Sequence, residues 1–173
     1  MTATPRPMEA ILVATVTVTI AATVAFELAR DRTHVDPVFA GAFLWLFSTV
    51  FVLRVFGQLF VRARRPTWLP RSAEWNLTPY RLLLPVQAAI LAVMAWIDVD
   101  VCFDLGFWAD PKPRFGDAVR WFAYVYAGAM AIRYAVRMRR RPDQRWFGGA
   151  IPIVFHWVLA AYLYVLGTFH ASY

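Results

Sequence analysis

The sequence has very little cysteine and very little lysine. Cys102 is the only cysteine, so the chain cannot form an internal disulfide, and the cysteine count says nothing about the redox compartment. Lys112 is the only lysine among 18 basic residues, and the others are all arginines. This preference for arginine indicates a GC-rich bacterial genome.

Catalytic signatures are also missing. The chain has no Ser-His-Asp order, no glycine-rich phosphate loop, no HExxH segment and no pair of cysteines. It has no internal repeat, and the segments between its apolar runs are too short to form a soluble core of their own. The sequence therefore leaves open whether the protein is an enzyme, and it identifies no catalytic residue.

Charge is absent from several long stretches. Hydrophobic residues make up 60% of the 173-residue chain, whereas soluble domains contain about 45–50%. A helix needs roughly 20 mostly apolar residues to cross a membrane. We predict an all-α bundle of five transmembrane helices in a single domain, residues 1–173, with helices at about 8–29, 37–61, 81–103, 117–137 and 146–170. The fourth of these segments is the least apolar, because only Trp121 to Ile132 is free of charge.

The first apolar run resembles a signal peptide only in part. Its uncharged section, Ala10 to Phe26, is longer than a usual signal-peptide core, and no small-x-small cleavage site follows it. We expect this run to be retained as a helix.

Proline and glycine mark boundaries and contacts. Most prolines lie between the apolar runs, as expected of residues that end helices. Pro152 lies within the fifth predicted helix, which we expect it to kink. Gly41, Gly57 and Gly128 are expected to let helices approach closely.

The net charge of +7 is divided unevenly among the predicted loops. Arginines gather in residues 62–81 and 137–145, whereas acidic residues gather in 27–37 and 98–120. The positive-inside rule then places the N-terminus in the cytoplasm and the C-terminus outside. Because topology explains the basic clusters, no nucleic-acid partner is expected. The predicted location is a bacterial inner membrane, crossed several times.

Carboxylates follow the third apolar run. Asp98, Asp100 and Asp104 are expected to lie in the outer interface, where water can solvate them. Apolar and polar residues alternate strictly from Ile97 to Leu105, which is typical of a strand, so the sequence leaves open whether residues 98–105 are helical or extended. Together with His34, these carboxylates are candidate metal ligands. The alternative is that they pair with nearby arginines and Lys112.

Two histidines share one face of the fifth predicted helix. His156 and His170 are fourteen residues apart, which is close to four turns and about 21 Å. This helix superficially resembles the haem-ligating helices of cytochrome b-type proteins, so haem b is a candidate cofactor. A bis-histidine haem needs a ligand from a second helix, and only His34, a dimer mate or a partner subunit can supply it. The alternative is that His156 is a hydrogen-bonded packing residue.

Polar residues are predicted in the inner half of the bundle. A charge inside a membrane is expensive and suggests a function by default. Arg54 is predicted about 10 Å from the cytoplasmic end of its helix, within snorkelling reach. The alternatives are a pocket for an anionic headgroup, a quinone or a substrate, and an arginine that snorkels or pairs with Glu9. The candidate cofactor-binding residues, histidines included, are His156, His170, Arg54, Arg133, Gln58 and Gln87.

These observations favour a non-catalytic accessory, anchoring or assembly subunit of a larger membrane complex. The expected partners are the lipid bilayer and other membrane subunits or further copies of the chain. An odd number of helices lacks the inverted-repeat symmetry of many transporters. Two alternatives stay open: a haem- or quinone-binding redox protein, and a small transporter or lipid-modifying enzyme.

Overall fold

The computed structural model describes residues 7–31, 33–64, 80–140 and 151–172, and this part of the chain is helical without strands. The five long helices match the five predicted segments, although residues 146–150, the predicted start of the last one, lie outside the described residues. The elements are α1 (Pro7–Ala29), α2 (Pro37–Arg64), α3 (Tyr80–Cys102), the short α4 (Gly106–Ala109), α5 (Pro113–Arg140) and α6 (Ile151–Ala171).

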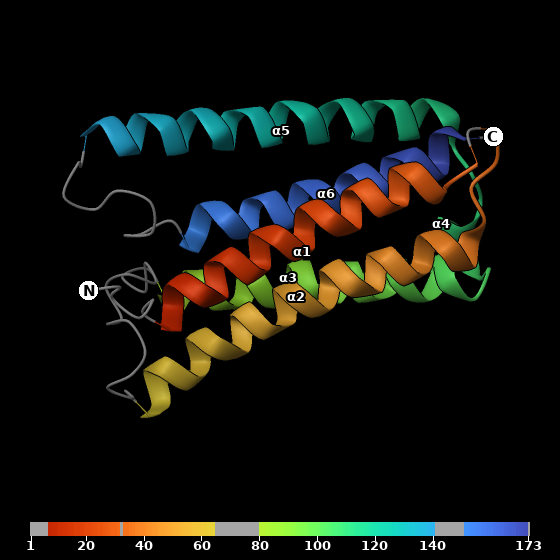
Figure 1. Ribbon diagram of the computed structural model, residues 1–173. Coiled ribbons are helices and arrows are strands. Elements are labelled where there is room, and N and C mark those ends of the chain that lie inside the picture. The colour runs from red at the N-terminus through yellow and green to blue at the C-terminus, as the bar shows by residue number, and fades with distance from the viewer. Residues whose placement is uncertain (1–6, 32, 65–79, 141–150, 173) are drawn as a thin grey trace.

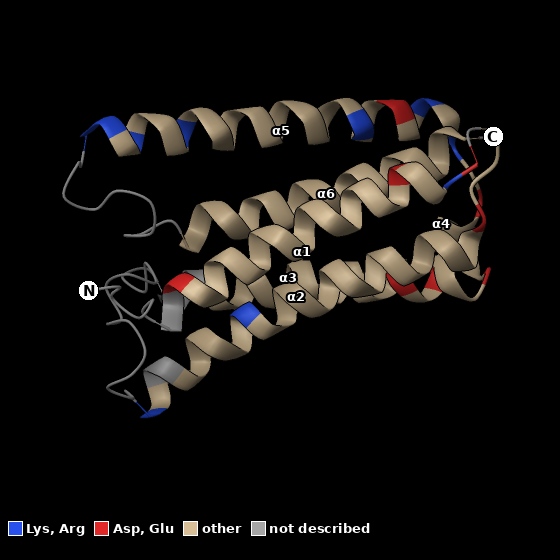
Figure 2. Ribbon diagram, viewed as in Figure 1, with Lys and Arg blue, Asp and Glu red and all other residues tan. Residues whose placement is uncertain are grey.

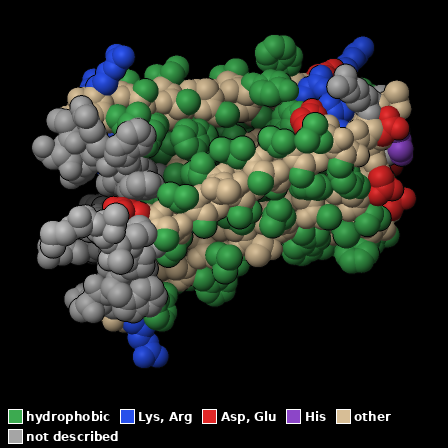
Figure 3. Space-filling model, in the orientation of Figure 1, with side chains coloured by type: hydrophobic (Ala, Val, Ile, Leu, Met, Phe, Trp, Pro, Cys, Tyr) green, Lys and Arg blue, Asp and Glu red, His purple; other side chains and the backbone are tan. Residues whose placement is uncertain are grey.

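The long helices run alongside one another and alternate in direction, so α1 begins at one end of the bundle and α6 finishes at the other (Figure 1). We call the end where α1, α3 and α6 finish the acidic end, because most described carboxylates lie there (Figure 2). The opposite, basic end carries Arg64 of α2 and the arginines in the last turn of α5. Hydrophobic side chains cover the flank between the two ends (Figure 3).

In the described part of the chain, four helices are long and apolar enough to cross a membrane: Glu9–Ala29, Pro37–Phe60, Leu84–Cys102 and Ile151–Ala171. Helix α5 is longer than any of these spans, but Arg120 and Arg133 interrupt its apolar part. The fold is therefore consistent with a multi-pass membrane protein of at least four crossings.

Helix α6 is the central helix of the bundle. It packs against α1, α2 and α5, and Tyr162 extends to α3, where its hydroxyl lies 3.3 Å from the Met94 carbonyl oxygen. A helix that is apolar on every side is expected to be enclosed by others, and most α6 side chains are buried. Pro152 is the second residue of α6 as described, and because residues 146–150 lie outside the described residues, the kink expected there stays a prediction.

Two glycines let α5 and α6 approach closely near the acidic end. A Cβ on Gly116 would lie 2.4 Å from the Ala171 nitrogen, and one on Gly167 would lie 2.6 Å from the Arg120 nitrogen. Both obstacles are backbone atoms, which cannot move aside as a flexible side chain can. The contact therefore requires glycine on both helices, as in other close helix pairs in membranes.

Helix α2 begins with a capping aspartate followed by a proline. The Asp36 carboxylate accepts a hydrogen bond from the Phe39 N–H at 2.8 Å, and Pro37 occupies the first helical position. An aspartate cap followed by proline is a favoured helix start.

The segment after Ile97, which the sequence left open between helix and strand, is helical as far as Cys102. Asp104 then adopts a left-handed conformation with φ of 53°. The Leu105 N–H closes the helix on the Asp100 carbonyl oxygen at 2.8 Å, a common helix ending. The alternation could not decide between the two structures, because Val99 and Phe103 also share the exposed face of a helix.

Candidate functional site

A cavity of about 670 Å³ lies between α1, α2 and α6. Its deep wall includes Leu12, Arg54 and Phe155, which are buried. The side chains at its mouth are exposed, and Leu53 (66%) and Phe56 (63%) are the most exposed of them. These two residues lie within the apolar span of α2, so the cavity opens on the flank of the bundle and not at either end.

Arg54 places a positive charge in the wall of this cavity. Its side chain is only 8% exposed, and its guanidinium lies 5.1 Å from the Phe155 ring centroid and 5.7 Å from that of Phe51. Among the described residues, no carboxylate forms an ion pair with Arg54, and its Nε makes no hydrogen bond. The guanidinium is thus held by two aromatic faces and has N–H groups left to donate.

Arg54 lies at about the depth that the sequence indicates. The candidate span of α2 ends at Phe60, six residues further on, which is about 9 Å along the axis. The side chain is enclosed by the bundle and does not lie along its surface. The predicted pairing with Glu9 is not seen among the described contacts.

Gln58 and Gln87 add buried polar groups nearby. Gln58 lies one turn after Arg54 on α2 and is 1% exposed, while Gln87 on α3 is 3% exposed. Within the described residues, both side-chain polar atoms of Gln58 and the Gln87 amide nitrogen lack hydrogen bonds. Neither residue lines the cavity. They show that the interior near Arg54 contains more polar groups than the described contacts satisfy.

His156 lies at the contact between α5 and α6. Its Nδ1 donates to the Pro152 carbonyl oxygen, and its ring meets that of Tyr126 edge-on, with centroids 5.9 Å apart. Arg54 and Arg133 are close enough to act on it electrostatically. The side chain does not line the Arg54 cavity. In this structure His156 has the surroundings of a hydrogen-bonded packing residue.

His170 is enclosed by aromatic rings near the acidic end. It is fully buried, with the Phe169, Phe115 and Trp108 ring centroids at 5.1, 5.4 and 6.2 Å. Neither ring nitrogen makes a hydrogen bond with a described residue. The two α6 histidines therefore have different surroundings, and no other helix of this chain supplies a third.

The carboxylates at the end of α3 also differ from one another. Asp98 is fully buried and accepts a hydrogen bond from the Tyr162 hydroxyl at 3.0 Å, so the expectation that water solvates it is wrong. Asp100 accepts the Trp108 N–H at 3.3 Å, whereas Asp104 and His34 are exposed. No three His, Cys, Asp or Glu side chains gather into a metal-sized group in the described part of the chain.

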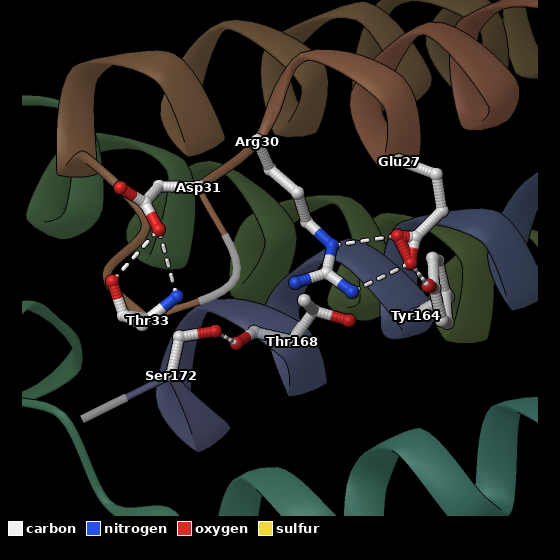
Figure 4. A network of polar contacts seen from close by, with 7 residues as sticks. All are labelled: Glu27, Arg30, Asp31, Thr33, Tyr164, Thr168 and Ser172. Carbon is white, nitrogen blue, oxygen red and sulfur yellow. Dashed lines mark hydrogen bonds and ion pairs between the residues drawn. The ribbon is translucent and has the colours of Figure 1, made fainter.

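A polar network at the acidic end joins α1 to α6, and the sequence analysis did not predict it (Figure 4). Arg30 donates two hydrogen bonds to the Glu27 carboxylate, at 2.6 and 2.7 Å, and these bonds raise the pKa of Arg30. The Tyr164 hydroxyl donates to the same carboxylate at 2.5 Å. Beyond α1, Asp31 accepts hydrogen bonds from Thr33 that lower the pKa of its carboxyl.

Glu27 and Tyr164 line a second cavity of about 400 Å³ between α1, α5 and α6. Arg30 already neutralises the carboxylate, so this cavity presents no uncompensated charge. It differs from the Arg54 cavity in this respect.

The described side chains place no nucleophile beside a base and a third, orienting group, the arrangement expected for acyl or phosphoryl transfer. What the Arg54 cavity can do is bind, because it combines an apolar surface with a cationic donor that no described carboxylate pairs with. Compared with known proteins, the chain matches no family model, no curated protein and no solved structure.

Proposed function

We propose that the protein is a non-catalytic component of a bacterial cytoplasmic membrane that holds an amphipathic molecule in the Arg54 cavity. The observation that carries this proposal is a buried guanidinium, in the wall of an apolar cavity, that has no carboxylate partner among the described residues. A molecule with an apolar body and a polar acceptor group fits both features.

The proposed threading has five crossings, with the N-terminus inside and the C-terminus outside. The arginines at the basic end and the carboxylates at the acidic end support it (Figure 2). The orientation follows from the preference of arginines near apolar helices for the cytoplasmic side.

Helix α5 is the least apolar of the five proposed crossings, but its packing against α6 supports the proposal that it crosses the membrane. Gly116 contacts the end of α6 at Ala171, and Tyr134 contacts Trp157 with ring centroids 5.9 Å apart. Helix α5 therefore covers most of the length of a candidate spanning helix. Its charge-free run of about 12 residues spans ~18 Å, and the long stems of arginines at its two ends, Arg120 and Arg133, would let their charges reach the interfaces.

The test is to identify what the protein retains on purification. Wild-type protein is purified from bacterial membranes in a mild detergent, and apolar molecules are extracted and quantified by mass spectrometry. We expect an amphiphile at near one per chain, reduced about tenfold in Arg54→Met, a loss of about 1.4 kcal/mol in binding free energy. Arg139→Met, which removes one exposed arginine outside the cavity, is the control and should retain the amphiphile. Equal retention in all three proteins would refute the proposal.

The accessory role in a larger complex is a second candidate. Helix α5 packs mainly against α6, and Trp121, Val125 and Ile132 leave a strongly exposed apolar stripe on it. Another membrane subunit or lipid fits such a face. The same purification tests it, since a subunit would appear as a polypeptide in fixed stoichiometry.

A further inference from the structure

We propose that the ligand of the Arg54 cavity is an anionic amphiphile, with a carboxylate or phosphate head and an apolar tail, which enters from the lipid between α1 and α2. This inference rests on the proposed function, because it names the ligand class of the same cavity.

The charge of the head follows from Arg54. A buried cation is strongly unfavourable unless an opposite charge or a strong dipole compensates it. The rings of Phe51 and Phe155 lie 5.7 and 5.1 Å from the guanidinium and compensate part of this charge, but they accept no hydrogen bond in the guanidinium plane. A neutral alcohol or quinone carbonyl accepts a hydrogen bond and leaves the net charge in place. A carboxylate or phosphate satisfies the donors and neutralises the charge together.

The route of entry follows from the exposed side chains. On α1, Ile11 and Val18 are 44% and 41% exposed, and on α2, Leu53 and Phe56 are 66% and 63% exposed. All four line the cavity, and all lie within the candidate spans of their helices. In a bilayer this mouth faces hydrocarbon. The two helices also diverge toward the basic end (Figure 1), so an amphiphile reaches the cavity sideways without crossing water.

The depth of Arg54 suits the head of a membrane amphiphile. Arg54 lies six residues before Phe60, where the candidate span of α2 ends, and six residues correspond to about 9 Å. An arginine stem bridges much of this depth, so the head lies just below its usual level. In the proposed threading this level belongs to the cytoplasmic leaflet. Val18 and Val50 line the cavity on the side toward the bilayer centre, where the tail lies.

The experiment compares ligands with the same tail and different heads. Full-length protein is placed in phosphatidylcholine nanodiscs, and binding of radiolabelled oleate is measured, with oleyl alcohol, phosphatidylglycerol and a neutral benzoquinone as competitors. We expect oleate to bind at least about tenfold more tightly than oleyl alcohol. Competition by phosphatidylglycerol but not phosphatidylcholine would identify a phospholipid as the source of the head. Competition by free oleate alone would identify a fatty acid.

The variants separate charge from shape. Arg54→Met should remove the preference for oleate, Arg54→Lys should keep part of it, and Ala14→Phe should fill the cavity and weaken oleate and oleyl alcohol alike. Arg139→Met is the control. Far-UV circular dichroism checks that each variant is folded. If Arg54→Met does not fold, Ala14→Phe still tests whether oleate binds in the cavity.

The two proposals fail in different ways. Equal binding of oleate and oleyl alcohol, or oleate binding that Arg54→Met leaves unchanged, would overturn the anionic ligand while the cavity still binds an amphiphile. If neither oleate nor any competitor binds, the proposed function itself is wrong.

Discussion

Single polar side chains connect the helices of this bundle across its apolar interior. The Tyr162 hydroxyl of α6 donates to Asp98 of α3, and Ser48 of α2 lies beside the same carboxylate. At the acidic end, Tyr164 donates to Glu27 of α1. Because water cannot replace these partners in hydrocarbon, each bond fixes the rotation of its helix about its own axis.

The bond between Tyr162 and Asp98 can be tested on its own. Tyr162→Phe removes the hydroxyl and leaves a buried carboxylate with one partner fewer. We expect a loss of about 1 kcal/mol in the free energy of unfolding, the usual size for a hydrogen bond between membrane helices. Thermal unfolding in detergent measures it. Tyr124→Phe is the matched control, because the Tyr124 hydroxyl makes no hydrogen bond within the described residues. An equal loss in both variants would show that the effect of Tyr162→Phe does not come from the bond to Asp98.

Helices α5 and α6 depend on small residues where they come closest. A Cβ at Gly116 would meet backbone nitrogen at 2.4 Å, but a Cβ at Gly128, on the same helix, would meet nothing within 4 Å. The packing therefore requires glycine at position 116 but not at position 128, a difference that the sequence does not reveal.

This difference predicts opposite signs for the same substitution. Gly116→Ala should force α5 away from α6 and destabilise the protein by about 1–3 kcal/mol, as overpacking does. Gly128→Ala should be neutral or stabilise by up to about 1 kcal/mol, because alanine favours the helix. Chemical or thermal unfolding of the two variants decides the matter, and destabilisation of both by the same amount would contradict the close contact.

The molecule as a whole separates its charges along one axis. Its flank is apolar, its basic end carries arginines and its acidic end carries carboxylates (Figures 2 and 3). Such a distribution prevents the bundle from turning over in a membrane, since each charged end would then have to pass through hydrocarbon.

The threading is testable with a membrane-impermeant maleimide. In a Cys102→Ala background, Asp110→Cys should react in intact spheroplasts, where the reagent reaches only the outer face of the cytoplasmic membrane. Arg139→Cys should react only after this membrane is permeabilised. Asp110 precedes α5 and Arg139 lies in its last turn, so the two positions lie at opposite ends of the bundle. Labelling of both from one side would show that α5 does not cross, and it would remove the five-span arrangement.

The sequence predicted the long helices well, because a charge-free run of sufficient length has few alternatives to a membrane helix. It even located α5, whose apolar run is short. It left the structure open where a local pattern fits two structures, as in the alternation after Ile97. It missed the Glu27 network and the contact of Gly116 with Gly167, because these depend on which helices become neighbours. For Arg54 the sequence offered a pocket as one alternative, but it could not indicate which helices line the cavity.

The central helix follows, in the chain, every helix that it contacts. During translation α2 and α3 therefore leave the ribosome with Arg54 and Asp98 before Phe155 and Tyr162 have been made. Until residues 151–171 are inserted, these polar groups face either lipid or the insertion machinery. A stalled nascent chain that lacks this segment is thus expected to be a substrate for membrane proteases.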